Sequence, residues 1–140
     1  MDRIETTKII YYGYSLGCAP AIDLAVQFPS QKIILEAPFA SGEALVQSGA
    51  LLDIPGSFLL KGEFNNQAKI KNIHVPVAVI QGINDKFIDI EKNGAVIYRN
   101  ANDPKVFIRV PEADHTNIPQ TMTIPTYSEF LYNVINWSFN

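Results

Sequence analysis

The chain has 140 residues, of which 47% are hydrophobic, and its formal net charge is −3. This length predicts one domain or part of one, with enough apolar residues for a globular core. The acidic balance and the lack of a Lys- or Arg-rich run argue against nucleic acid as a partner. No apolar stretch reaches the roughly 18 residues of a membrane span, so we expect no transmembrane segment in this chain.

The chain contains one cysteine, Cys18. A single cysteine excludes an intrachain disulfide and a cysteine-rich zinc site, and we interpret Cys18 as a small buried hydrophobe. The N-terminal sequence MDRIETTKII lacks the pattern of a signal peptide. We therefore expect a cytoplasmic setting, with no metal and no cofactor.

The first part of the chain alternates between strand and helix patterns. Residues 8–12 form an apolar, β-rich run that predicts a strand buried on both faces. Residues 16–28 favour a helix, with Pro20 near its first turn, and residues 32–35 predict a second strand. Strand, helix and strand in this order make a βαβ unit.

Residues 37–70 are the least regular part of the sequence. Ser41 is placed to cap a short helix over residues 42–47, and the apolar run that follows is interrupted by Pro55 and Gly56. Two interpretations stay open for this region. It is either a packed crossover or a short lid that shapes a substrate pocket.

The second part of the chain continues the alternation. The predicted elements are a third strand at 75–80, a helix at 90–100, a fourth strand at 106–110, a long polar loop at 111–125 and an amphipathic helix at 127–137. The sequence therefore predicts a single α/β domain over residues 1–140. Its parallel sheet has about four strands in chain order, with helices on both faces.

Residues 13–17, GYSLG, join the first strand to the first helix. Strand, tight turn and helix around G-x-S-x-G is the context of a nucleophile elbow. The sharp turn strains the backbone of Ser15. We expect the flanking Gly13 and Gly17 to let strand and helix approach without a Cβ clash.

Three side chains suited to nucleophilic catalysis follow three of the predicted strands. Ser15 follows the first strand, Asp85 the third and His115 the fourth. Functional loops of parallel sheets lie beyond the carboxyl ends of the strands, so we expect the three to converge. The chain order Ser, Asp, His is also the order that the elbow pattern requires.

Other residues compete for these roles. Glu36 and Asp89 are rival acids, with Asp85 in the better motif. His74 precedes the third strand, at the wrong end of the sheet, and is interpreted as structural. Asp114 adjoins His115 and is expected to hydrogen-bond within its loop.

The chain resembles the C-terminal half of an α/β-hydrolase fold serine hydrolase, in the branch of abhydrolase-domain lipases and depalmitoylating thioesterases. The resemblance covers essentially the whole chain and rests on GYSLG at 13–17, LEAPFAS at 35–41, IKNIHVPVAVIQGINDKFIDI at 70–90 and PEADHTNI at 111–118. The family commonly has His where this chain has Gln81, and Gly where it has Asp114.

The resemblance implies that Ser15 is the nucleophile, Asp85 the acid and His115 the base, with the backbone N–H of Leu16 as one oxyanion-hole donor. It also implies that the first four strands of the fold, and the loop that supplies a second donor, are missing. Residues 8–12 would then form an open sheet edge, through which we expect self-association.

The leading functional hypothesis is a serine hydrolase of small-molecule carboxylic esters or thioesters that forms an acyl-enzyme on Ser15. One alternative is a non-catalytic relative that binds a ligand or a protein, or an inactive fragment. A flavodoxin-like module with a coincidental serine turn is a further alternative. A phosphate-binding loop there would be richer in Ser, Thr and Gly than GYSLGCAP.

Overall fold

The structure is a computed structural model, and it describes residues 5, 8–48 and 64–139. The elements are, in chain order, β1 (Ile10–Tyr14), η2 (Ser15–Gly17), α1 (Cys18–Gln27), β2 (Lys32–Glu36), α2 (Gly42–Gln47), α4 (Asn66–Lys69), η3 (Ile70–Asn72), β3 (Val77–Gly82), α5 (Gly94–Asn100), β4 (Lys105–Val110), α6 (Ile118–Thr121) and α7 (Ile124–Asn136). All four predicted strands are confirmed, with bounds shifted by one to two residues.

The region 111–125 differs from the prediction of a long loop, because it contains α6 and the start of α7. Pro119 and Pro125 are compatible with these helices. Each lies in the first turn of its helix, where the missing N–H and the fixed φ of proline are tolerated.

The four strands form one parallel sheet in the order β1-β2-β3-β4, which confirms the predicted topology. Strands β2 and β3 are buried along their whole length. The prediction that β1 is buried on both faces was wrong, because β1 lies at one edge of this sheet and Tyr12 and Tyr14 are exposed.

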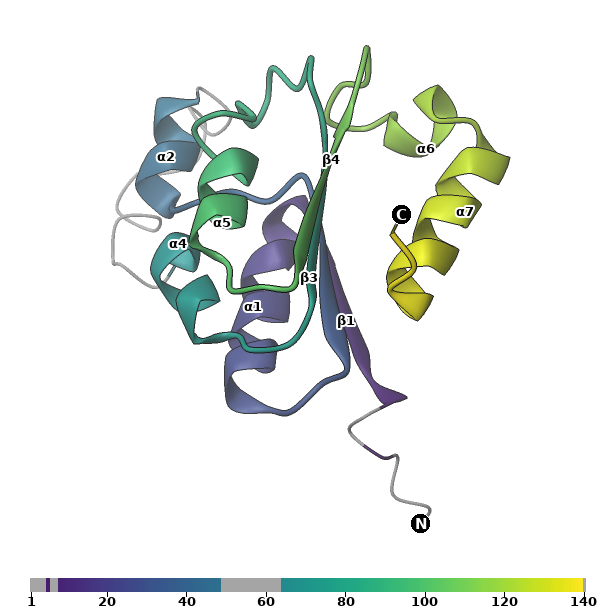
Figure 1. Cartoon of the computed structure of the whole chain (residues 1–140). Coiled ribbons are helices and arrows are strands. Elements are labelled where there is room, and N and C mark those ends of the chain that lie inside the picture. Colours follow the sequence, from purple (N-terminus) through teal and green to yellow (C-terminus); the bar gives the residue numbers. More distant parts are fainter. Residues whose placement is uncertain (1–4, 6–7, 49–63, 140) are drawn as a thin grey trace.

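Helices cover both faces of the sheet, as predicted (Figure 1). On one face, α1, η3 and α5 pack against alternate residues of β2 and β3 such as Ile33 and Val79. On the other face, α6 and α7 pack against Ile34, Ala78 and Ile80. The core thus consists of two apolar layers separated by the sheet.

Helix α7 is held at both ends by charged residues of β2. The buried Lys32 donates to the carbonyl oxygens of Val134 (3.3 Å) and Ile135 (2.6 Å) near the helix C-terminus. The hydroxyl of Tyr127, in the first turns, donates to Glu36 at 2.7 Å. The cation at the C-terminus suits the helix dipole.

The predicted cap of α2 is confirmed, because the Ser41 side chain accepts a hydrogen bond from the backbone N–H of Ala44. The apolar run 51–60, interpreted as crossover or lid, lies outside the described residues. Within the described ranges, no helix has the length and apolarity needed to cross a membrane.

Candidate active site

Ser15 lies at the sharp turn between β1 and α1. It is the first residue of η2 and its φ is 52°, in the left-handed region that strains an L residue. A Cβ built on Gly13 would stand 2.6 Å from Cα of Cys18 and 2.7 Å from the carbonyl oxygen of Gly17. Glycine at position 13 therefore allows α1 to begin directly against the end of β1.

The second glycine of the motif has a different environment. A Cβ built on Gly17 would meet no atom within 4 Å, and its φ of −64° is available to any residue. The prediction that both flanking glycines provide space is thus correct for Gly13 and wrong for Gly17, because a side chain at position 17 would enter open space.

Asp85 lies in the turn that follows β3. One carboxylate oxygen, Oδ1, accepts from the backbone N–H groups of Phe87 (2.9 Å) and Ile88 (2.8 Å). The other, Oδ2, accepts from the side-chain amide of Gln81 at 3.3 Å. The Asp85 side chain is completely buried. These donors fix the carboxylate and offset the cost of its burial.

His115 lies in a turn after β4. The carboxylate of Asp114 accepts from the backbone N–H groups of Thr116 (2.7 Å) and Asn117 (3.1 Å), as expected for a loop-forming residue. The hydrogen bond from Thr116 is the main reason that the pKa of Asp114 lies below its ordinary value. Asp114 thus shapes the turn that presents His115.

Ser15, His115 and Asp85 meet at the carboxyl edge of the sheet. The distance from His115 Nε2 to Ser15 Oγ is 2.9 Å, and that from His115 Nδ1 to Asp85 Oδ2 is also 2.9 Å. Because a carboxylate can only accept, Nδ1 carries the proton and Nε2 is free to accept from the Ser15 hydroxyl. The three residues therefore form a directed hydrogen-bond relay.

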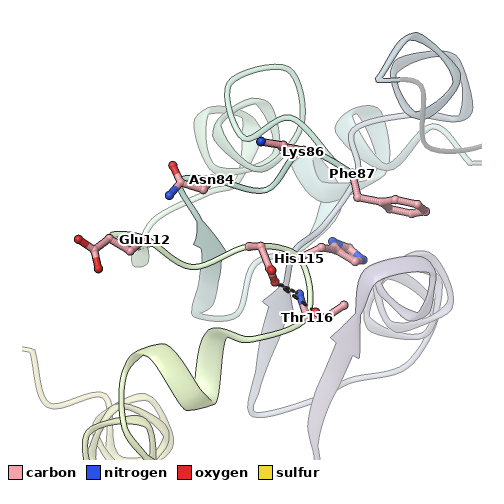
Figure 2. Close-up of a pocket in the computed structure, with 7 residues that line it drawn as sticks. Asn84, Lys86, Phe87, Glu112, His115 and Thr116 are labelled. Atoms are coloured by element: carbon pink, nitrogen blue, oxygen red, sulfur yellow. Dashed lines mark hydrogen bonds between the residues drawn. The ribbon is translucent and has the colours of Figure 1, made fainter.

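Aromatic rings flank the histidine. The centroid of the His115 ring is 5.5 Å from that of Tyr14 and 5.0 Å from that of Phe87. His115 and Phe87 line a pocket of about 780 Å³. Figure 2 shows both side chains in a close-up of this pocket. The pocket is lined by Asn84, Lys86, Phe87, Glu112, Asp114, His115 and Thr116.

The rival acids are engaged elsewhere. Glu36 accepts from the hydroxyls of Tyr12 and Tyr127, and Asp89 accepts from the backbone N–H of Lys92 at 2.8 Å. Burial raises the pKa of Tyr127 to about 12 and that of Tyr12 further, and the Glu36 carboxylate adds to both effects. The carboxylate on the His115 ring is that of Asp85.

Sequence reasoning missed two contributors to this geometry. Gln81 is fully buried and its amide donates to Asp85 and, at 2.7 Å, to the carbonyl oxygen of Ile88. The sequence did indicate a role for Gln81, because a polar residue at the end of an apolar buried strand requires a hydrogen-bond partner. The hydroxyl of Tyr14 donates to the carbonyl oxygen of His115, and no sequence pattern indicates this contact.

Cys18 is buried on α1, as predicted, and its thiol donates to the carbonyl oxygen of Gly13 at 3.2 Å. Burial raises the pKa of this thiol well above its ordinary value, so it stays protonated and unreactive. His74 lies just before β3, at the opposite end of that strand from Asp85. Among the described residues, no group of His, Cys, Asp and Glu is arranged to hold a metal ion.

No family model matches the chain. An uncharacterised protein of Mycobacterium tuberculosis is 32% identical over 116 residues, which are 81% of this chain and 40% of that protein. The α/β-hydrolase domain-containing protein 17B of Homo sapiens is 30% identical over 115 residues, which are 82% of this chain and 38% of that protein. The chain thus spans about 40% of the length of the curated relatives that it matches.

Solved structures also resemble the chain. Acetyl xylan esterase 1 from a Thermoanaerobacterium species superposes with a TM-score of 0.73 at 16% identity, over 96% of this chain and 47% of that one. Other similar structures include further esterases and a monoacylglycerol lipase. The described sheet and its helices are a partial α/β-hydrolase fold.

Proposed function

We propose that this partial α/β-hydrolase fold carries the reactive residues of a serine hydrolase that cleaves carboxylic esters or thioesters. One observation carries the proposal: the relay from Ser15 Oγ through the His115 ring to the carboxylate of Asp85, with 2.9 Å at each step. The esterases and the lipase among the similar structures support the general class of hydrolase.

In the proposed reaction, His115 Nε2 takes the hydroxyl proton as Ser15 Oγ bonds to the acyl carbon. The oxyanion that forms is stabilised by the backbone N–H of Leu16, which lies in the first turn of η2 where N–H groups lack helical partners. Asp85 holds the imidazole tautomer and stabilises its cation.

The bond from the acyl carbon to the alkoxide or thiolate then breaks, and the leaving group takes the proton from His115 Nε2. Water, deprotonated by His115, attacks the acyl group on Ser15 and releases the free acid. We propose an apolar acyl group, because Leu16 and Phe87 beside the relay expose 50% and 44% of their surface. A cytoplasmic setting remains part of this proposal.

The test is covalent labelling of the full-length protein with a fluorophosphonate probe, followed by peptide mass spectrometry. We expect the label on Ser15, none on Ser15→Ala, and turnover of p-nitrophenyl esters and acyl thioesters by the wild type only. A folded wild-type protein that takes no label would overturn the proposal and favour a non-catalytic binding module.

A further inference from the structure

Tyr14, the residue that precedes Ser15, makes two contacts with His115. Its hydroxyl donates to the backbone carbonyl oxygen of His115 at 2.9 Å. Its ring lies 5.5 Å from the imidazole, with the two planes tilted by 30°. The same residue thus contacts both the backbone and the ring of the histidine whose Nε2 faces Ser15.

We propose that Tyr14 is a positioning residue for His115, which fixes the imidazole at hydrogen-bonding distance from the Ser15 hydroxyl. The inference rests on the proposed function for its catalytic consequence, but its structural part stands without it.

The two loops that carry Ser15 and His115 belong to distant parts of the chain. Ser15 and His115 lie 100 residues apart in the chain and follow the non-adjacent strands β1 and β4. Asp114 orders the His115 turn internally, but bonds within a turn do not set its distance from Ser15. The Tyr14 hydroxyl does set this distance, because it bonds the His115 backbone to the residue next to Ser15.

The hydroxyl remains a donor throughout the range in which histidine titrates. Burial raises the pKa of Tyr14, and the negative charges of Glu36, Asp85 and Asp114 raise it further. The hydrogen bond from Tyr14 to the His115 carbonyl oxygen therefore stays neutral around pH 7.

Tyr14 differs from a residue that only stabilises the fold. It is 41% exposed, so removing its hydroxyl costs little packing. A small shift of a catalytic group, in contrast, has a large effect on rate. Loss of the Tyr14 hydroxyl is therefore expected to affect the reaction more than the stability.

The experiment compares Tyr14→Phe with Tyr12→Phe in the full-length protein. Both substitutions remove a hydroxyl from the same strand, but that of Tyr12 bonds to Glu36 instead of His115. The readouts are kcat and KM for ester hydrolysis, the denaturation midpoint and the NMR resonance of the His115 Nδ1 proton. That proton lies between His115 and Asp85 and reports the geometry of the ring directly.

For Tyr14→Phe we expect kcat to fall roughly fivefold or more at unchanged KM, the rate equivalent of one lost hydrogen bond, and the Nδ1 resonance to broaden or shift. Tyr12→Phe should keep both kcat and the resonance. Tyr14→Leu, which also removes the ring, should lower kcat further.

Two results would overturn the inference: an unchanged resonance and kcat in folded Tyr14→Phe, or equal losses in Tyr14→Phe and Tyr12→Phe. Failure of the proposed function looks different. The wild-type protein would then show no turnover that depends on Ser15, while the Nδ1 resonance would still report whether Tyr14 positions His115.

Discussion

The carbonyl oxygen of Ala113 lies where a side chain on Gly82 would begin, because a Cβ built on Gly82 would stand only 2.3 Å from that oxygen. The end of β3 and the turn after β4 therefore cross in direct backbone contact. The same turn carries His115, two residues further on. The placement of the histidine relative to Asp85 thus depends on glycine at position 82.

We predict that Gly82→Ala damages both stability and activity. A backbone carbonyl cannot move aside like the end of a flexible side chain, so the His115 turn must shift. Such overpacking costs about 1–3 kcal/mol in unfolding free energy. Urea unfolding and ester turnover of the full-length protein measure the two effects.

Gly17→Ala is the matched control, since a Cβ there meets no atom within 4 Å. This variant should keep its activity, and its free energy of unfolding should rise by up to about 1 kcal/mol, because alanine restricts the unfolded chain. Comparable losses in the two variants would show that the effect of Gly82→Ala does not come from the contact with Ala113.

These two glycines show what the sequence can and cannot reveal. The order of strands and the convergence of Ser15, Asp85 and His115 were predictable, because parallel strands place their following loops at one edge. Whether a particular glycine is needed for space depends on which backbone lies beside it. That neighbour comes from a distant part of the chain, as Ala113 does for Gly82.

The same limit applies to the polar contacts. A buried amide at Gln81 signalled that a partner was required, but not that the partner was Asp85. Tyr14 was predicted only as a residue of the GYSLG turn, and nothing in the sequence indicated its bond to His115. The burial of β1 on both faces was wrongly predicted because its apolar composition resembles that of the buried β2 and β3.

Asp85→Asn should lower kcat by about 10²–10⁴-fold, because an amide neither holds the required imidazole tautomer nor stabilises its cation. Stopped-flow or steady-state ester hydrolysis measures the loss. The matched control is Asp89→Asn four residues later, whose carboxylate accepts only a local bond from Lys92 among the contacts described. If Asp89→Asn were the more damaging substitution, the assignment of the acid would be wrong.

The hydrogen bonds from the hydroxyls of Tyr12 and Tyr127 to Glu36, here called the Glu36 network, predict a loss of folding stability at alkaline pH. Burial raises the pKa of Tyr127 from 10.0 to about 12. A raised folded-state pKa contributes stability that is fully present below pH 10 and is lost as pH rises towards about 12. The unfolding midpoint should therefore fall across this interval, and less so in Tyr127→Phe. Tyrosinate absorbance should also show a group that titrates late, and its absence in the wild type would contradict the network.

Cys18 should not react with an aromatic disulfide reagent in the native protein and should react fully in urea. Its side chain is completely buried and its thiol donates to the carbonyl oxygen of Gly13. Thiol reagents should therefore leave ester hydrolysis unchanged. Rapid native modification accompanied by inactivation would instead indicate that α1 opens and that its cysteine takes part in the chemistry.

Two substitutions of Ser15 separate the chemistry of its side chain from the strain of its backbone. Ser15→Ala and Ser15→Gly both remove the hydroxyl, so both should abolish ester turnover and probe labelling.

The two variants differ in how they tolerate a φ of 52° at position 15. The left-handed region costs an L residue about 1–2 kcal/mol, and glycine escapes that cost while it loses about 0.5–1 kcal/mol more conformational entropy on folding. Ser15→Gly should therefore be more stable than Ser15→Ala by up to about 1.5 kcal/mol in urea unfolding, and Ser15→Ala should match the wild type. A Ser15→Gly variant that is less stable than Ser15→Ala would show that the turn is not strained, and residual turnover in both would place the nucleophile elsewhere.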